Sequence, residues 1–279
     1  LNPTRQRPDL WVDQKDYVTP LWDSMVKGTI PDATPFALPK FNSASGLVGD
    51  HSQGTEPTPG SYTTAGQTIT PVPISGKVEI NREVLDQGGN PQISVILWGQ
   101  IQRNYREALE SKAAAMLNGL SAGLTTITIT TGATNKALAK ATRTAFSALQ
   151  FVRGGFRFRD LKLQVDLYTA LSAAEDDAGH PLYPAIAAQN VDGSTDALWA
   201  ALNVNGLVGV PAWALGATSG NSSKSWLYDR NDVHGWATPP QRLDFEYQVK
   251  SVDMGVWGYQ ATACTDITGV RAVGYDPTV

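Results

Sequence analysis

The sequence predicts a mixed α+β fold with one dominant helix, preceded by a long segment that cannot build a core by itself. Between residues 77 and 273, stretches of alternating polar and apolar residues, typical of strands, are interleaved with helical patterns. One helical pattern, over residues 91–117, is much longer than the rest. The first 76 residues are rich in proline and glycine instead, and the aromatic residues among them follow neither periodicity.

Composition limits the classes of function. The 279 residues carry 22 Lys and Arg against 26 Asp and Glu, a net charge of −4, which excludes a strongly basic nucleic-acid binder. Only 17% of the residues are charged, while Trp, Tyr and Phe number 8, 9 and 7. So few charges beside so many aromatic side chains favour a surface that partners partly cover. Cys264 is the single cysteine, so the chain can form no internal disulfide and no cysteine-based metal site.

Residues 1–40 are predicted to form an extended N-terminal arm. Prolines recur through this segment, and they break regular elements. Its aromatic residues are too numerous for a solvated linker, so we expect them to dock on another surface; the alternative is a frayed terminus. The expected contact residues of the arm are Trp11, Tyr17, Trp22 and Phe36.

Residues 41–76 are predicted to form a protruding two-stranded loop. This segment contains no Lys or Arg. Residues 62–74 have β-prone character, but Pro71 and Pro73 restrict them to an edge or an isolated ribbon. The segment is too long for an ordinary connection, and the alternative is a disordered insertion. The expected contact residues of the loop are Val48, Asp50, His51, Glu56, Tyr62 and Ile69.

The body of the chain begins with a half-buried strand over residues 77–84, where apolar and polar residues alternate. A helix over residues 91–117 follows, with an asparagine and a proline at its start and an apolar stripe along one face. Its charged residues, Glu110 among them, are assigned mainly to the solvated face. The next helix is expected over residues 135–152, with a helical turn over 168–174. Further strands are expected over residues 125–131, 161–167, 207–215, 243–249, 254–263 and 269–273.

No arrangement of residues points to catalysis, a cofactor or a metal. The three histidines, His51, His180 and His234, lack the spacing that puts two ligands on one helical face. No serine lies in a nucleophile elbow, and Cys264 lies in a β-type run where burial as a small apolar residue is expected. One basic cluster, interleaved with phenylalanines, could contact phosphates or an acidic loop of a neighbour, unless it is a solvent-facing strand edge. Its members are Arg153, Arg157, Arg159 and Lys162.

No stretch of the sequence is expected to span a membrane. The most apolar stretch, residues 206–217, falls short of the ~20 residues that a spanning helix requires, and it contains a proline and several glycines. The chain opens with Leu1 and shows no signal-peptide pattern, so we expect either that upstream residues were removed or that the numbering starts after processing.

Three motifs, in the order of segments described above, resemble a known family. Residues 73–86 (P-I-S-G-K-V-E-I-N-R-E-V-L-D) look like the family's passage from a strand to its spine helix. Residues 207–211 (L-V-G-V-P) look like its G-x-P strand, and Tyr228-Asp229-Arg230 followed by residues 245–263 looks like its closing region. Together they resemble the major capsid proteins of tailed bacteriophages, over nearly the whole chain.

The resemblance implies a Hong Kong 97-like capsid fold with an N-terminal arm, an extended β-hairpin loop, a long spine helix, and peripheral and axial domains. Residues 1–40 would be the arm and residues 41–76 the extended loop, which lies across neighbouring subunits. By residue number, the peripheral domain would comprise 77–122, with the spine helix at 91–117, and 225–263; the axial domain would comprise 123–224 and 264–279.

The resemblance also implies a structural function. Copies of the chain would form a homo-oligomer of hexamers and pentamers that closes an icosahedral shell around double-stranded DNA. The implied partners are a portal, a scaffolding segment or protein, a maturation protease and a cement or decoration protein, with packaged DNA contacted weakly and without sequence preference. No cofactor and no membrane are implied. The implied location is the virion capsid, assembled in the cytoplasm of the bacterial host.

One departure from the family concerns covalent cross-links. Some relatives bond a lysine of the extended loop to an asparagine of a neighbour, with a carboxylate assisting. This sequence has no lysine between Lys40 and Lys77, and its last asparagine is Asn231. We therefore expect a shell without covalent links between subunits.

Three alternatives belong to other classes of protein. An encapsulin-like compartment would keep the fold and enclose an enzyme rather than a genome. A soluble α/β enzyme would need a convergent set of titratable residues, and a decoration protein would ordinarily show more β-repeat and no helix as long as 91–117.

Overall fold

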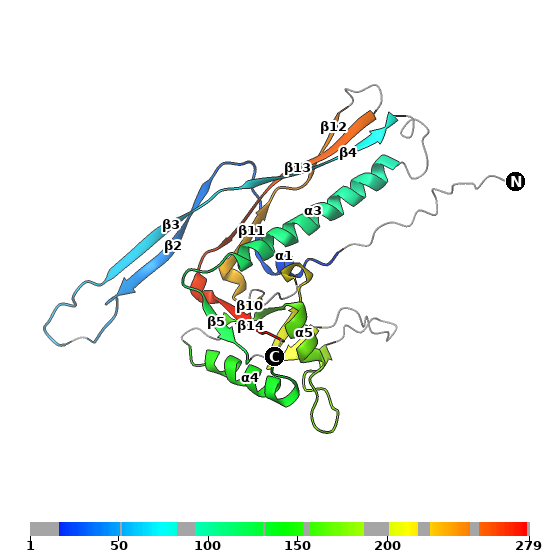
Figure 1. Cartoon of the computed structure of the whole chain (residues 1–279). Coiled ribbons are helices and arrows are strands. Elements are labelled where there is room, and N and C mark those ends of the chain that lie inside the picture. The colour runs from blue at the N-terminus through cyan, green and yellow to red at the C-terminus, as the bar shows by residue number, and fades with distance from the viewer. Residues whose placement is uncertain are drawn as a thin grey trace.

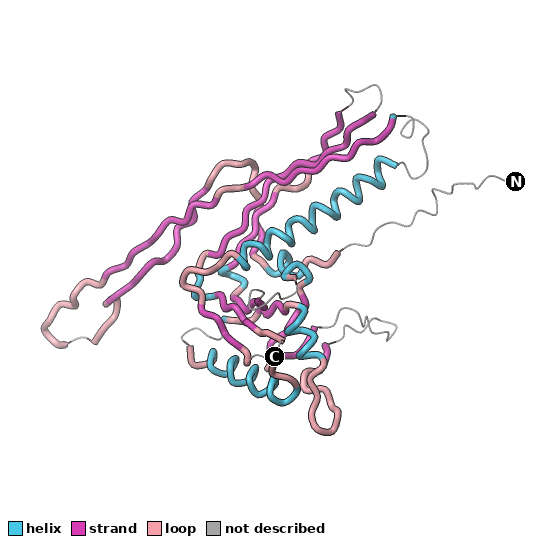
Figure 2. The backbone as a smooth tube through the Cα atoms, viewed as in Figure 1, coloured by secondary structure: helices cyan, strands magenta, loops and turns pink. Residues whose placement is uncertain are grey.

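The computed structural model describes residues 17–50, 52–82, 93–130, 132–152, 157–186, 201–216, 224–245 and 251–277. These residues form an elongated molecule in three parts: a long two-stranded ribbon, an upper sheet lined by a long helix, and a lower domain with shorter helices (Figure 1). Figure 2 shows that the ribbon stands apart from the other two parts over most of its length.

The upper sheet has five strands, and its longest member holds it together. β13 pairs antiparallel with β4 through ten successive residues, from Ser251 opposite Asn81 to Gln260 opposite Val72. It also pairs with β11 and β12, and β1 adds to β11 in parallel. The strands are β1 (Val26–Gly28), β4 (Val72–Asn81), β11 (Val233–Ala237), β12 (Gln241–Phe245) and β13 (Ser251–Cys264).

The long helix α3 (Ile93–Asn118) runs along this sheet and buries one stripe of its surface. Buried residues recur at three- and four-residue steps, as helical geometry requires for one face. Tyr105 fits because Gly258 on β13 has no side chain; a Cβ there would overlap the phenol ring. The Tyr105 hydroxyl donates a hydrogen bond to the carbonyl of Thr238 (2.9 Å). The stripe comprises Ile101, Tyr105, Leu109, Ala113 and Leu117.

The lower domain contains a seven-stranded sheet in the order β5-β14-β10-β6-β9-β8-β7. Helices α4 (Asn135–Leu149) and α5 (Val165–Ser172) pack against it through Leu138, Phe146 and Leu167. The strands are β5 (Thr125–Thr128), β6 (Asp160–Leu163), β7 (Ala185–Ile186), β8 (Ala201–Val204), β9 (Leu207–Pro211), β10 (Lys224–Tyr228) and β14 (Val270–Gly274).

The two sheets are joined by two crossings that lie side by side. β10 leads through the short 3-10 helix η4 (Arg230–Asp232) into β11, and β13 leads through η5 (Ile267–Gly269) into β14. Backbone hydrogen bonds tie the crossings together, from Asp229 N to Gly269 O (3.0 Å) and from Thr265 N to Asp232 O (2.9 Å). One apolar core continues across the joint, because side chains of β10 pack into the same cluster as the stripe of α3.

Three expected element boundaries differ from the structure. The alternation over residues 161–167 ends at Leu163, and the chain turns at Gln164 into α5, so Val165 and Leu167 belong to a helix. The strand expected over 207–215 ends at Pro211, followed by a 3-10 turn, η3 (Trp213–Leu215). The expected extended loop, 41–76, is displaced: its ribbon starts at Phe36 and ends at Ile69, and β4 already belongs to the upper sheet.

The division into domains also differs at one strand. β10 lies in the seven-stranded sheet of the lower domain between β14 and β6, although residues 225–263 are expected in the upper part. Its residues pair with strands from two other regions of the sequence, and such long-range pairing cannot be seen in a local pattern. No helix in the described ranges has both the length and the apolar character needed to cross a bilayer.

Candidate functional site

The ribbon is the part of the molecule with the least support from its own chain. It consists of β2 (Phe36–Ser45) and β3 (Ser61–Ile69), which pair only with each other. From Pro39 to Thr64, every described residue is exposed. An isolated two-stranded ribbon is at best marginally stable in water, so this length of exposed strand needs a further surface to pack on.

Short-range contacts keep the two strands in register. The rings of Phe41 and Tyr62 lie 5.6 Å apart between centroids, on opposite strands. Next to them, the hydroxyls of Ser43 and Thr63 are 2.6 Å apart, at a bulge in β2. Where the strands end, the backbones of Gly46 and Gly60 approach so closely that a Cβ on Gly60 would overlap the Gly46 carbonyl. The ribbon is therefore a defined element even where nothing covers it.

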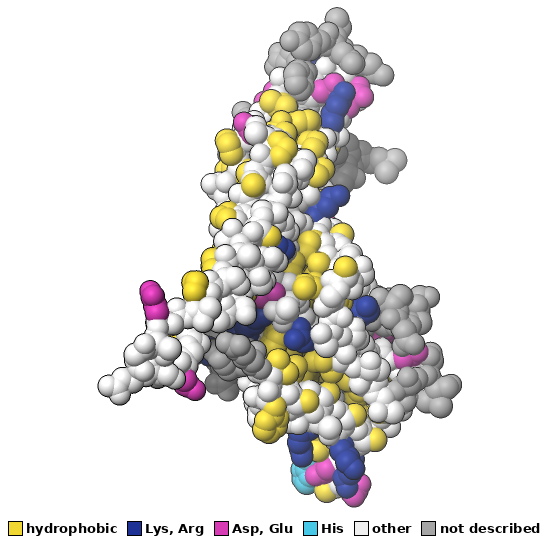
Figure 3. All heavy atoms as spheres, turned by 90° about the vertical axis from the view of Figure 1, so that its left-hand side faces the viewer, with side chains coloured by type: hydrophobic (Ala, Val, Ile, Leu, Met, Phe, Trp, Pro, Cys, Tyr) yellow, Lys and Arg dark blue, Asp and Glu magenta, His cyan; other side chains and the backbone are white. Residues whose placement is uncertain are grey.

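The outer half of the ribbon presents large apolar side chains to solvent. Phe41 is 59% exposed, Leu47 56%, Val48 95% and Tyr62 60%. Apolar surface gathered in this way marks a site for contact with other molecules. Hydrophobic side chains also run in a band along the face of the molecule that Figure 3 shows.

The base of the ribbon, in contrast, is fixed to the upper sheet. Ile69 is buried with Ala261, Ala263 and Ile30 in a small separate cluster. The Gln67 side chain donates a hydrogen bond to the carbonyl of Cys264 (3.2 Å). The ribbon can therefore extend away from a firm attachment rather than from a loose linker.

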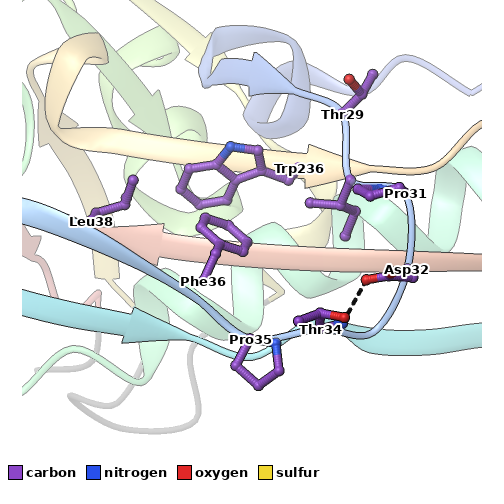
Figure 4. Close-up of a pocket in the computed structure, with 9 residues that line it drawn as sticks. Thr29, Pro31, Asp32, Thr34, Pro35, Phe36, Leu38 and Trp236 are labelled. Atoms are coloured by element: carbon purple, nitrogen blue, oxygen red, sulfur yellow. Dashed lines mark hydrogen bonds between the residues drawn. The ribbon is translucent and has the colours of Figure 1, made fainter.

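Beside this attachment lies an apolar groove of about 570 Å³. The rings of Phe36 and Trp236 meet edge to face there, with centroids 5.2 Å apart, and Leu38 lies next to them (Figure 4). On the other side, the Thr34 amide donates to the Asp32 carboxylate (2.8 Å) and closes the loop that borders the groove. The groove is part of the same partly uncovered region as the ribbon.

The expected contact residues of the arm differ in how far the structure buries them. Trp22, in the short helix α1 (Pro20–Ser24), is only 8% exposed, because its ring packs closely against Gly235 within the core. It is therefore a core residue rather than the contact residue expected from the sequence. Tyr17 is 49% exposed, with its ring 6.0 Å from that of Trp213, and Phe36 is half-buried. Trp11 lies outside the described residues.

A carboxylate that the sequence places on the solvated face of α3 holds the end of the arm. Glu110 is fully buried and accepts hydrogen bonds from the backbone amides of Leu21 (2.9 Å) and Trp22 (2.7 Å). These amides begin α1, where a helix has no acceptors of its own. Burial raises the pKa of Glu110 above its ordinary value. The segment from Thr19 to Ile30 is thereby part of this chain's own core, and only the sequence before it remains a free-arm prediction.

The expected contact residues of the loop also differ in exposure. Val48, Asp50, Glu56 and Tyr62 are all exposed on the outer ribbon. Ile69 is only 5% exposed and packs at the base within its own chain, so it offers no surface to a neighbour. His51 lies outside the described residues.

The expected basic cluster does not form one patch. The Arg157 guanidinium pairs with Asp266 (3.1 Å), lies 3.8 Å from Asp232 and donates to the Thr268 hydroxyl (2.9 Å). It thus clamps the two crossings of the joint. Lys162 lies on an inner strand and is 6% exposed, and burial lowers its pKa below the ordinary value. Arg159 is exposed, and Arg153 lies outside the described residues.

Burial accounts for the largest pKa shifts among the titratable groups of the described residues. Burial raises the pKa of Asp232 to about 6 and that of Cys264 to about 11. His234 stacks on Trp236, and His180 lies 3.2 Å from the Asp176 carboxylate. Within the described ranges, no three His, Cys, Asp or Glu side chains come together as a set of metal ligands.

The whole chain is similar to solved capsid structures. The capsid of the native GTA particle matches with a TM-score of 0.72 and 12% identity, over 99% of this chain and 95% of that chain. The capsid of the cyanophage P-SCSP1u matches with 0.63 and 15%, over 99% and 93%. The capsid of the Myoviridae phage XM1 matches with 0.63 and 13%, over 98% and 96%. No protein-family model matches the sequence, and no curated protein matches it either.

These similarities extend over the ribbon, the upper sheet and the lower domain together, because nearly all of each chain is covered. The α+β fold of the phage-capsid type, which the sequence predicts, is therefore confirmed.

Proposed function

We propose that this chain is the major capsid protein of a tailed bacteriophage, a structural protein whose copies assemble into hexamers and pentamers of an icosahedral shell around double-stranded DNA. The observation that carries the proposal is the uncovered outer ribbon. Phe41, Leu47, Val48 and Tyr62 expose apolar surface on an element that its own chain does not cover. A neighbouring copy that covers them supplies the burial that the ribbon lacks.

The rest of the molecule suits a role as a building block. The base of the ribbon is anchored to the upper sheet through Ile69 and Gln67, so a force on the ribbon is transmitted directly to that sheet. The low content of charge allows many copies to lie side by side without strong repulsion, and a net charge of −4 favours only weak contact with packaged DNA. The phage-capsid fold supports the same function.

The partners and location of the chain follow from this proposal. A portal, a scaffolding segment or protein, a maturation protease and a cement or decoration protein are the expected partners, and the virion is the expected location, with assembly in the host cytoplasm. The proposed role is structural rather than enzymatic.

Electron microscopy of the purified chain at high concentration tests the proposal. We expect closed shells, or rings of five or six copies, and nuclease-protected DNA in particles from an infected host. A chain that stays monomeric at every concentration would contradict an assembly function. Shells that contain an enzyme and no DNA would identify the encapsulin-like compartment instead.

The expected absence of covalent links has its own test. Lys40, exposed on β2, is the one lysine of the ribbon, and no other lysine lies between it and Lys77. In this proposal the shell is held by non-covalent contacts. Denaturing electrophoresis of mature particles should show one band at the mass of the monomer. A ladder of covalent oligomers is the result that would overturn the expectation.

A further inference from the structure

A second partly apolar groove lies in the lower domain, far from the ribbon. It has a volume of about 640 Å³ and is lined by Phe146 and Leu149 of α4, by Phe158, and by Val208 of β9. Two apolar side chains that line it reach into solvent: Val152, just after α4, is 41% exposed and Val208 is 49% exposed. Surface of this kind on a soluble domain indicates contact with another molecule.

Two guanidinium groups give this groove a positive charge. Arg143 lies one turn before Phe146 on α4, and Arg159 lies beside Phe158, and both line the groove. Both residues are exposed, and neither forms an ion pair with another described residue. The groove is therefore suited to a ligand that is acidic and partly apolar.

At the other end of α4, the chain carries a small acidic turn over residues 175–181. Glu175 and Pro181 pair across its neck, and the Asp176 amide donates to the His180 carbonyl (2.9 Å). The Asp176 carboxylate accepts from the amides of Ala178 (2.8 Å) and His180 (2.9 Å), which holds the turn in one conformation. A turn that is ordered in advance loses little conformational freedom when it binds.

The two remaining acids of this turn are available on its surface. Glu175 is exposed, and the Asp177 side chain is 87% exposed although it pairs with Lys136 at the start of α4. That ion pair ties the turn to the N-terminal end of α4. The groove lies along the C-terminal half of α4 and begins at Arg143, so seven residues of the helix, roughly 10 Å at 1.5 Å per residue, separate Arg143 from Lys136, which holds the turn.

We propose that the groove at the C-terminal end of α4 receives the acidic turn of a second copy of this chain, with Arg143 and Arg159 facing Glu175 and Asp177. The turn is an ordered protrusion with acidic side chains, and the groove is a concave surface with two arginines, so the two match in shape and charge. Because the two surfaces are different and share no residues, the contact is head-to-tail, and it closes into a ring when each copy is rotated by a fixed angle. The proposal rests on the proposed assembly function and assigns residues to one of its contacts.

Charge reversal tests this pairing with three variants of the full chain. The groove variant is Arg143→Glu with Arg159→Glu, and the turn variant is Glu175→Arg with Asp177→Arg. The control, Lys112→Glu with Lys140→Glu, changes the net charge by the same amount as the groove variant at two exposed lysines. Circular dichroism shows whether each variant is folded, and sedimentation velocity measures its assembly.

We expect the groove variant and the turn variant each to lose assembled species, and the control to assemble like the wild type. A 1:1 mixture of the groove and turn variants should regain rings of six copies, because every groove then faces a turn of opposite charge when the two variants alternate. Rings of five cannot alternate and should not return. This regain cannot come from a folding defect.

Three results would overturn the proposal. The first is normal assembly of the groove variant with normal DNA content. The second is normal assembly with reduced DNA content, which would assign the groove to phosphates. The third is loss of assembly in both variants with no regain in the mixture. In each case the wild type would still form shells, so the proposed function would stand; a wild type that never assembles would instead remove the proposed function itself.

Discussion

At the scale of single residues, the buried carboxylate of Glu110 stabilises the packing of α1 on the long helix. Its two carboxylate oxygens accept hydrogen bonds from the backbone amides at the start of α1, and these bonds attach the arm segment to the long helix. The sequence places Glu110 on the solvated face of the helix and gives no sign of its partners, because both amides come from residues about 90 positions earlier. A pattern of side chains does not show which backbone amides a carboxylate will contact. For the same reason, the sequence does not show that α1 and Trp22 pack on their own chain rather than on a neighbour.

Substituting Glu110→Gln should lower the free energy of unfolding by about 1–3 kcal/mol, the usual value of hydrogen bonds to a buried charged group. The amide retains one acceptor oxygen, so one of the two amides of α1 loses its partner. Urea unfolding measures the change, and limited proteolysis should cut near residues 17–30 sooner. Glu107→Gln, on the same helix and only half-buried, is the control. Equal losses in both variants would contradict the role of Glu110.

Asp232 predicts a pH dependence at the joint between the sheets. Its pKa is raised from 3.8 to about 6 by burial, so the folded protein binds this proton more tightly than the unfolded chain does. The ionised group therefore destabilises the fold above pH 6, by up to about 3 kcal/mol at 1.36 kcal/mol per pKa unit. This penalty disappears as the pH falls from 6 towards 4.

The variant Asp232→Asn should accordingly be more stable than the wild type at pH 8, with a gap that narrows through pH 6 and closes near pH 4. Chemical denaturation across this pH range measures the gap. Asp50→Asn, on the exposed ribbon, serves as the control for a general charge effect. A gap that stays constant with pH would show that Asp232 does not titrate in this range.

At the scale of elements, the long helix was predictable and the short strands were not. The helix expected over 91–117 is found at Ile93–Asn118 among the described residues, since a stripe of many turns gives an unambiguous period. The alternation over 161–167 was misleading, because the apolar residues after Leu163 fit a strand and a helix equally well. β1, β10 and β11 were missed because each is short and is specified by its partners in the sheet.

The exposed side chains of the ribbon are expected to contribute to assembly but not to the stability of the single subunit. Leu47→Ser with Val48→Ser removes side chains that are 56% and 95% exposed, so the free energy of unfolding should change by no more than about 0.5 kcal/mol per substitution. Assembly should weaken strongly, because the same side chains are the surface that a neighbour buries. Thermal unfolding and sedimentation velocity measure the two quantities.

Val165→Ser, which removes an apolar side chain that is 49% exposed on α5, is the control for a general loss of apolar surface. Normal assembly of the ribbon variant, or weakened assembly of both variants to the same degree, would count against the ribbon as the contact.

At the scale of the whole molecule, the order of segments carried more information than any one motif. The uncovered ribbon, the long helix and the paired sheets follow one another as the sequence predicts, although the ribbon lies a few residues earlier and β10 belongs to the lower sheet. The candidate contact residues were less predictable. Whether Trp22, Ile69 or Lys162 is buried depends on which distant segment lies against it, and no local pattern carries that information.

The central claim is that the outer ribbon finds its burial on other copies of the chain. Hydrogen–deuterium exchange of the same protein, first as dispersed subunits and then as assembled shells, measures this directly. We expect the amides of residues 39–64 to exchange rapidly in the subunit and to become protected in the shell, while those of α3 are protected in both. Equal protection of the ribbon in both states, or none in either, would contradict the claim.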